Sequence, residues 1–234
     1  MKRLTIILLG VCLLAMPSFA SAGMEKTRKP GWGPRSSKAA AKLVDRSRWE
    51  PRPQNRKANH RVPGRKLLRA WRNRSDMPYR HLVDGRFRGT TDEIIQWAAH
   101  KWGINTDLMR AAATVESWWE MKTFGDNGDS FGLYQVRRPY HCWGKCRIAR
   151  HFTAFNADYY GGIIRSYFDG TQTWLNTVEG NGKRYRKGDL QGSLGTWYSG
   201  RWWGPPERPI EPYLSDIRMR RAERTWQQPF FVGK

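Results

Sequence analysis

Residues 103–120 read GINTDLMRAAATVESWWE and have the pattern of a short amphipathic helix that begins at Asn105 or Thr106. The apolar residues recur at intervals of three and four positions, as expected for one buried helix face: Leu108, Ala111, Ala112, Val115 and Trp119. Glu116 lies at the edge of this stripe, in the last turn, and two tryptophans follow it. It is either an ordinary solvated helix glutamate or a carboxyl group whose pKa is raised by apolar surroundings, as a general acid near neutral pH requires.

The segment that follows, FGDNGDSFGLYQVR (residues 124–137), combines three glycines with acidic and amide side chains. Its polar residues include Asp126, Asp129 and Gln135, whereas Leu133 and Val136 can anchor it in a core. Glycine allows tight turns and a close approach of the backbone to a ligand. A polar loop beside an acid on a helix is typical of a saccharide cleft. The alternative role of the two aspartates is to stabilise turns, which Asp favours.

Aromatic residues support the same interpretation. The chain has 13 tryptophans, and the stretch TWYSGRWW (residues 196–203) contains three of them. Flat rings pack against the C–H faces of sugars while nearby polar groups bind the hydroxyls. We expect Trp97 and Trp119 to belong to the core, and Trp202 and Trp203, which stand beside glycines, to face a saccharide.

Further helices are predicted on both sides of this region. Thr90 and Glu93 fit a capping box at the start of a helix, and Gly103 is a natural stop for that helix. Helical spacing of apolar residues also runs from Asn156 to Phe168 and from Leu214 to Trp226. Glycine-rich turns separate these segments and few alternating runs occur, so the fold class is mainly α.

The N-terminus has the pattern of a secretory signal peptide. Lys2 and Arg3 precede an apolar run, and Ala20-Ser21-Ala22 follows it. We predict a signal peptide over residues 1–22 that is cleaved after Ala22, which places the protein in the periplasm or outside the cell. The apolar run is too short to span a bilayer comfortably, and no transmembrane segment is expected in the mature chain, which we take to be a monomer.

The formal net charge of +22 is concentrated near the N-terminus. Residues 23–90 carry 20 Lys and Arg against 5 Asp and Glu, and contain many prolines and glycines with little hydrophobic periodicity. Residues 23–88 are therefore expected to form a basic arm or linker, disordered or loosely draped, that admits one short helix around Lys66–Arg72. Anionic envelope polymers are its expected partners and nucleic acid is not, and a solvated extension is the alternative. The arm lacks the strongly amphipathic basic helix of a membrane-disrupting protein.

Two cysteines remain after residue 22. Cys142 and Cys146 occur in CWGKC, and an oxidising compartment favours a structural disulfide between them. A zinc site including His141 is the alternative, but it lacks the second pair of ligands that such a site requires. No metal or other cofactor is expected.

The blocks GINTDLMRAAATVES, GDSFGLYQV and GTWYSG, in this order, resemble the soluble lytic transglycosylases and goose-type lysozymes over roughly residues 90–225. The resemblance implies a lysozyme-like helical domain over residues 89–234, with glycine-rich loops lining a saccharide cleft and peptidoglycan glycan strands as substrate. It also implies that Glu116 is the catalytic acid/base. The residues expected to contact the substrate are Ser117, Tyr134, Gln135, Tyr198 and Trp202.

Two departures from the family pattern bear on the reaction. Goose-type lysozymes have an acid at the position of Asp126, credited with positioning the attacking water, and a further acid where this chain has Arg137. The Tyr-Asn-Ala-Gly form common in transglycosylases is changed here to Tyr198-Ser199-Gly200. The loss of one acid favours a transglycosylase, which uses a single glutamate twice and forms 1,6-anhydro-N-acetylmuramic acid ends. A hydrolase that uses Glu116 and Asp126 and a non-catalytic cationic cell-wall binder are the alternatives.

Overall fold

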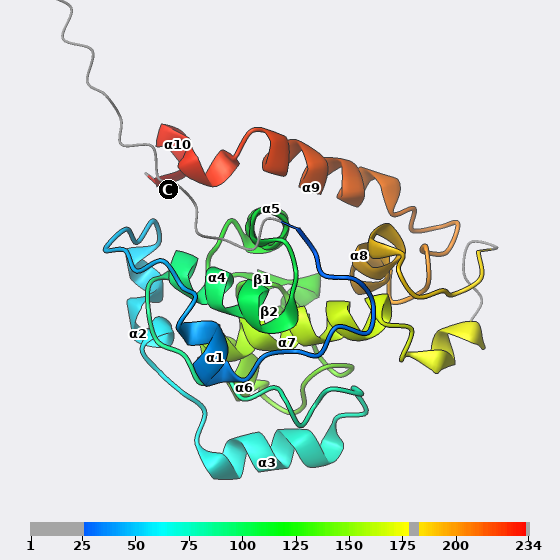
Figure 1. The fold of residues 1–234 in the computed structure, drawn as a ribbon, viewed down its shortest axis with the longest axis horizontal. Helices are drawn as coiled ribbons and strands as arrows, with labels where there is room; N and C mark the ends of the chain where they lie inside the picture. The colour runs from blue at the N-terminus through cyan, green and yellow to red at the C-terminus, as the bar shows by residue number, and fades with distance from the viewer. Residues whose placement is uncertain (1–25, 178–182, 233–234) are drawn as a thin grey trace, which may run out of the picture.

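The computed structural model of the chain describes residues 26–177 and 183–232. The expected signal peptide, residues 1–22, lies outside these ranges. Within them, no helix has both the length and the apolar character needed to cross a membrane. Among the described residues, helices account for most of the regular structure, and the one small sheet has three strands (Figure 1). The predicted fold class, mainly α, is confirmed.

The helices and strands follow one another in this order: α1 (Ser37–Ala41), α2 (Arg56–Asn59), α3 (Arg65–Arg74), α4 (Thr91–Trp102), α5 (Thr106–Ser117), β1 (Phe124–Gly125), β2 (Ser130–Phe131), β3 (Val136–Arg137), α6 (Arg147–Arg150), α7 (Thr153–Phe168), α8 (Leu190–Ser199), α9 (Glu211–Ala222) and α10 (Pro229–Val232). The strands pair antiparallel in the order β1-β2-β3, with Phe124 opposite Phe131 and Ser130 opposite Arg137. Short 3-10 turns occupy Pro53–Asn55, Asp126–Gly128, Thr173–Asn176 and Thr225–Gln227.

The ends of α4 agree with the signals in the sequence. The Thr90 hydroxyl accepts a hydrogen bond from the Glu93 N–H, and the Glu93 carboxylate accepts one from the Thr90 N–H, which completes the predicted capping box. Gly103 ends the helix in the left-handed region, with φ +63°. At the N-terminus of α5, the Asn105 side chain caps the helix by accepting a hydrogen bond from the Leu108 N–H at 2.7 Å.

Helix α7 is the centre of the fold, since all sixteen of its residues are buried. It packs against α4 on one side and α8 on the other, while α5 lies between α4 and α9 (Figure 1). Gly161 allows the close approach of α4, because a Cβ there would lie 2.5 Å from Cδ1 of Trp102. The prediction of a helix from Asn156 to Phe168 is confirmed, with a start three residues earlier. The predicted Leu214–Trp226 helix is displaced towards the N-terminus, to Glu211–Ala222.

The prediction of a disordered arm is wrong for residues 26–88. This segment wraps around the helical domain and inserts side chains such as Leu68, Trp71, Met77 and Phe87 into the common core. It is also tied by polar contacts, for example from the Arg28 N–H to the Gly103 carbonyl. The segment has too few apolar residues to fold alone, but the rest of the domain supplies the surface that those residues bury.

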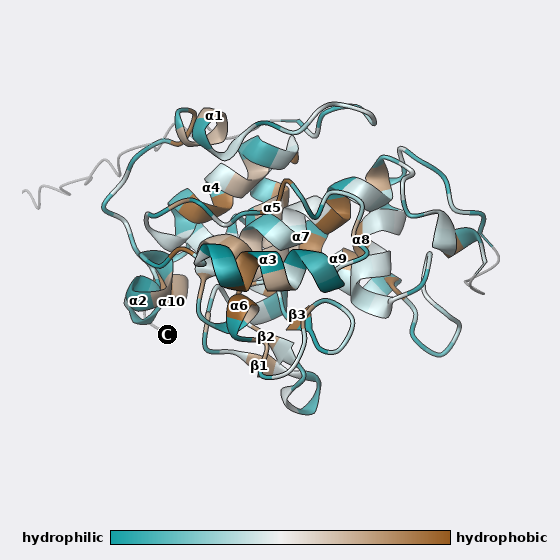
Figure 2. Cartoon of the chain, turned by 90° about the horizontal axis from the view of Figure 1, so that it is seen from below, coloured by the Kyte–Doolittle hydropathy of each residue, from teal (hydrophilic) through white to brown (hydrophobic). Residues whose placement is uncertain are grey.

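Helix α3 contains the short helix that was expected around Lys66–Arg72. Contrary to the sequence-based expectation, it is amphipathic and basic: Leu68 and Trp71 are buried, and basic side chains cover the outer face. Hydrophilic and hydrophobic residues accordingly alternate along α3 in Figure 2. Because its apolar side is occupied by the protein core, α3 has no free apolar face to insert into a membrane.

Candidate active site

A cleft of about 620 Å³ opens between the last turn of α5, the three-stranded sheet, α7 and the end of α8. This volume is within the usual range for small-molecule sites. Tyr159, Ile163 and Tyr167 line it from α7 at intervals of four residues, so they share one helix face. At 1.5 Å per residue, this floor extends over about 12 Å. The cleft is therefore elongated, as an oligosaccharide site must be.

Glu116 lines this cleft from the final turn of α5, as predicted. Its carboxylate Oε1 accepts a hydrogen bond of 2.5 Å from the hydroxyl of Tyr213, on α9. Burial raises the pKa of Glu116 to about 7, and the negative charge of Asp126 raises it further. Hydrogen bonds from Tyr213 and Trp197, and the positive charge of Arg208, lower it. The carboxyl group can thus be protonated near neutral pH and can also lose that proton, which is what an acid/base catalyst requires.

The turn after Glu116 is held in an uncommon conformation. Trp118 and Trp119 both have positive φ, 56° and 65°, and they end α5 by a left-handed turn. Arg52 donates to the Trp118 carbonyl at 2.8 Å, and Asn55 donates to the Trp119 carbonyl at 2.7 Å. Both donors are fully buried and come from the N-terminal segment. That segment therefore fixes the end of the helix that presents Glu116.

Asp126 lies in the cleft beside Glu116, but its carboxylate is engaged. Its Oδ2 accepts from the Ser130 hydroxyl at 2.5 Å and lies 3.6 Å from Nε of Arg137. The arginine that replaces the second acid of the resembled family is thus the ion-pair partner of Asp126. Asp129 does not line the cleft and forms an ion pair with Arg138, which agrees with the turn-stabilising alternative for this residue.

Gln135 lies in the cleft and is held there by the loop itself. It has a positive φ of 51°, and its side-chain amide donates to the Gly132 carbonyl at 2.9 Å. Gly125 lies next to this side chain, since an added Cβ would come within 2.4 Å of Oε1 of Gln135. The glycine at 125 therefore leaves room for the amide, whereas the predicted approach of the backbone to a ligand stays a prediction.

An aromatic wall faces Glu116 from α8 and α9. Tyr198 lines the cleft, as predicted, and stacks on Tyr213 with ring centroids 4.7 Å apart. The guanidinium of Arg208 lies over the Tyr198 ring, 4.5 Å from the ring centroid. Trp197 lines the cleft next to these residues. Tyr213 and Arg208 cover the Tyr198 ring, and Trp197 stacks on His141, so the wall presents ring edges and hydrogen-bond donors to the cleft.

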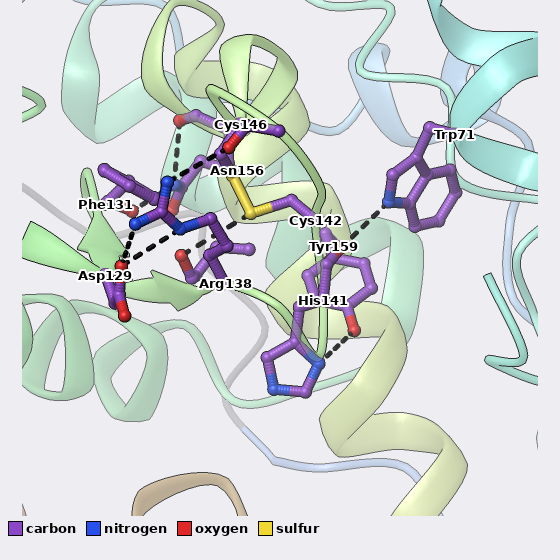
Figure 3. Close-up of a disulfide and its surroundings, with 12 residues drawn as sticks. Trp71, Asp129, Phe131, Arg138, His141, Cys142, Cys146, Asn156 and Tyr159 are labelled. Carbon is purple, nitrogen blue, oxygen red and sulfur yellow. Dashed lines mark hydrogen bonds and ion pairs between the residues drawn. A yellow bond between two sulfur atoms is a disulfide. The ribbon is translucent and has the colours of Figure 1, made fainter. Parts of the chain in front are cut away.

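His141 lines the cleft beside Trp197, on which it stacks at 5.0 Å. A 2.7 Å hydrogen bond joins its Nδ1 to the Tyr159 hydroxyl, and its carbonyl accepts from the Trp71 indole N–H (Figure 3). Burial, with a smaller effect of Arg137, lowers the pKa of His141 to about 4. The imidazole is therefore neutral at physiological pH and serves as a hydrogen-bonding group rather than a cation.

The predicted disulfide is present between Cys142 and Cys146, whose Cα atoms lie 5.3 Å apart (Figure 3). It closes the loop that begins at His141, and both cysteines are buried. On one side of this loop, Arg138 reaches Asp129, as Figure 3 shows. The disulfide therefore constrains a short loop within the segment between β3 and α6, directly after His141.

Three of the predicted substrate contacts are located differently. Tyr134 is fully buried, stacks on Tyr160 at 4.0 Å and donates to the Met109 carbonyl, so it belongs to the core. Trp202 is also a core residue, 1% exposed and packed edge-on to Tyr185. Gly192 on α8 makes room for this ring, because a Cβ there would lie 2.5 Å from Cζ2 of Trp202. Ser117 is buried and donates to the Leu133 carbonyl at 2.7 Å, which joins α5 to the glycine-rich loop.

Several cleft residues were not foreseen. Tyr213 contacts Glu116 from 97 positions further along the chain, and Arg208 precedes the same helix. Trp174 and Tyr140 line the cleft with 41% and 67% exposure, as rings available to a ligand do. Trp197 stands within the TWYSGRWW stretch that the sequence marks as aromatic, so the signal was present although the wrong tryptophan was chosen.

The described residues contain no group of three or more His, Cys, Asp or Glu side chains that could hold a metal ion. No protein-family model matches the chain, and neither a curated protein nor a solved structure matches it significantly. The chemistry of the cleft therefore has to be argued from its own residues.

Proposed function

We propose that this protein cleaves the β-1,4 bond between N-acetylmuramic acid and N-acetylglucosamine in peptidoglycan strands, with Glu116 as acid and base. One observation carries the proposal: an elongated cleft holds a carboxyl group whose pKa burial raises to about 7, hydrogen-bonded to Tyr213 and faced by aromatic rings. The resemblance of the three sequence blocks to lytic transglycosylases and goose-type lysozymes supports the same substrate class.

Glu116 first donates its proton to the glycosidic oxygen, and the bond from this oxygen to C1 of the muramic acid residue breaks. The carboxylate then accepts the proton of the 6-hydroxyl of the same sugar, whose oxygen closes on C1. The products are a free 4-hydroxyl on one fragment and a 1,6-anhydro end on the other, and Glu116 is again protonated. Because the nucleophile is part of the substrate, no water has to be activated.

The environment of Asp126 favours this internal reaction. Its carboxylate is shared between the Ser130 hydroxyl and Arg137, so its charge is partly neutralised. A second candidate, hydrolysis, has one observation in its favour: Asp126 lies in the same cleft and its charge acts on Glu116. In that case Asp126 would orient a water molecule for attack on C1.

A peptidoglycan substrate also agrees with the proposed location and charge. Export through the predicted signal peptide would bring the protein to the cell wall. Of the net charge of +22, only Lys2 and Arg3 lie in the predicted signal peptide, and the remaining positive charge would raise the rate of encounter with a polymer that carries peptide carboxylates, in a salt-dependent manner. These two properties support the substrate class, while the choice of bond depends on the cleft.

Digestion of purified peptidoglycan by the wild type and by Glu116→Gln, followed by mass analysis of the released muropeptides, tests the proposal. The variant keeps the shape of the side chain and removes the acid. Fragments lighter than hydrolysis products by one water, absent with the variant, would support the transglycosylase. Fragments with reducing ends that depend on Glu116 would instead support the hydrolase. Retention on the wall by a folded wild-type protein that releases nothing would leave the non-catalytic binder.

A further inference from the structure

A strongly basic surface lies outside the cleft, on α2, α3 and α6. No Asp or Glu occurs between Pro51 and Ser75 or between Ser130 and Ala157. The structure brings these two acid-free stretches together, because α3 packs against α6 and Arg61 lies over the ring of Phe152 at 5.2 Å. We call the result the cationic face, defined by six exposed side chains: Lys57, Arg61, Arg65, Lys66, Arg69 and Arg147.

The members of this face are close enough to act on the same groups. Lys57, Arg61 and Arg147 come from three separate parts of the chain. Burial is the largest effect that lowers the pKa of His151. The positive charges of Arg150 and of these three residues lower it further, so they lie around His151. These cations therefore lie together around His151, and α3, which packs on α6, carries the other three beside them.

The six cations also lack acidic partners within the described ranges of the chain, where ion pairs occur on other faces. On α9, by contrast, Arg218 pairs with Glu211, and just after α9 Arg224 pairs with Asp107. Unpaired like charges repel one another and destabilise the compact state. A surface that gathers them without acids is therefore suited to an external anion.

Helix α3 stands at the outer edge of the molecule in Figure 1, and Figure 2 shows it across the near face with α6 beside it. A protruding helix with cations on its flanks can reach a flat array of phosphates, whereas a single polymer strand is better held in a groove. The apolar side chains of α3, Leu68 and Trp71, are buried, so contact with a bilayer would be peripheral.

We propose that the cationic face docks the protein onto an anionic membrane surface through lipid phosphate groups. The guanidinium groups of Arg61, Arg65, Arg69 and Arg147 can each offer two parallel donors to one phosphate. Binding is electrostatic, reversible and sensitive to salt. This inference does not depend on the glycosidase proposal, because none of the six residues lines the cleft.

Sedimentation of the full chain with vesicles tests the inference. The probes are vesicles of equal parts phosphatidylglycerol and phosphatidylcholine, and vesicles of phosphatidylcholine alone. The triple variant Arg65→Gln, Lys66→Gln, Arg69→Gln removes three charges from α3. The matched control, Arg218→Gln, Arg221→Gln, Arg224→Gln, removes three from α9 and the turn that follows it. Circular dichroism and thermal unfolding of both variants establish that they are folded.

We expect binding of the wild type to the anionic vesicles only, weakening steeply with added sodium chloride. The α3 variant should bind about tenfold or more weakly, while the α9 control stays within about twofold of the wild type. Equal weakening by both variants would mean that net charge alone is responsible, and would overturn the proposal. So would vesicle binding by the α3 variant that equals that of the wild type, since the cationic face would then not hold the lipid phosphates.

Discussion

The hydroxyl of Tyr213 lies 2.5 Å from Oε1 of Glu116 and joins α9 to the last turn of α5. Burial raises the pKa of Tyr213 well above its ordinary value, so the hydroxyl stays protonated and acts as a donor. Tyr198 stacks on its ring and holds it in place. The proton affinity of Glu116 is therefore set by two opposing effects, burial that raises the pKa and donated hydrogen bonds that lower it.

Replacing Tyr213 by Phe should raise the pKa of Glu116 further, because a hydrogen bond to the carboxylate is lost. A general acid must begin protonated, so activity falls as pH rises through its pKa. The alkaline limb of kcat/KM, near pH 7 in the wild type, is expected to move up by about one pH unit. Tyr140→Phe is the matched control, since Tyr140 is an exposed cleft residue. A limb that moves to lower pH would contradict the assignment.

Replacing Asp126 by Asn should move the same limb in the opposite direction. The charge of Asp126 raises the pKa of Glu116, so its removal lowers that pKa, and Arg137, freed from its partner, acts with the same sign. If the reaction is internal, the variant retains activity within about tenfold and still forms anhydro ends, because no water needs to be oriented. A loss of more than about a hundredfold, with reducing-end products in the wild type, would instead assign Asp126 to a hydrolase.

The helices around Glu116 could be predicted because their signals are local. The capping box at Thr90 and Glu93, the stop at Gly103 and the cap at Asn105 all act within one turn of the chain. The hydrogen-bond partner of Glu116 could not be predicted from the sequence. Tyr213 is 97 positions away, and only the packing of α9 on α5 brings it close. The core position of Trp202 was missed for the same reason, since burial depends on what the fold places around a side chain.

The N-terminal segment was misjudged because its composition was considered in isolation. Between residues 26 and 88 the apolar side chains are few and widely spaced, as in a disordered chain. Here most of them meet the core of the following domain, as Trp71 does against Phe155 at 5.1 Å. Composition indicates whether a segment can fold alone, and says little about whether it can fold on a neighbour.

Asn55 is therefore expected to stabilise the protein, although it belongs to the N-terminal segment that the sequence predicted to be an arm. It donates to the Trp119 carbonyl and accepts from the Met121 N–H at 2.9 Å, both in the buried turn after Glu116. Asn55→Ala leaves these groups unsatisfied and should lower the free energy of unfolding by about 2–3 kcal/mol in urea titrations. Gln54→Ala, its partly exposed neighbour, should change it by less than about 0.5 kcal/mol. Similar values for the two variants would remove the structural role of Asn55.

Two tryptophans should separate binding from stability. Trp174 is 41% exposed in the cleft, and its indole N–H donates a 2.7 Å hydrogen bond to Gln172 that orients the ring. Trp174→Ala should therefore raise KM for glycan strands by up to about tenfold with little change in Tm. Trp202→Ala removes a buried ring and should cost about 3–5 kcal/mol of stability. Steady-state kinetics and thermal unfolding of both variants check this. A normal KM for Trp174→Ala would remove this ring from the binding surface.

The raised pKa of Glu116 also makes a prediction about folding that requires no substrate. In the unfolded chain the carboxyl ionises near its ordinary value of 4.5, and in the folded protein near 7. Its contribution to stability is therefore complete below pH 4.5 and is lost as pH rises through 7, where the partly buried carboxylate carries a charge. Glu116→Gln avoids that charge, so its Tm should equal that of the wild type at pH 4 and exceed it at pH 8. The expected gap is about 1–2 kcal/mol after allowance for solvent screening, or about 3–6 °C. Other titrating groups are common to both proteins and cancel in the comparison. A gap that does not change between pH 4 and pH 8 would show that the carboxyl titrates normally, and Glu116 would then lose the property on which its role as an acid depends.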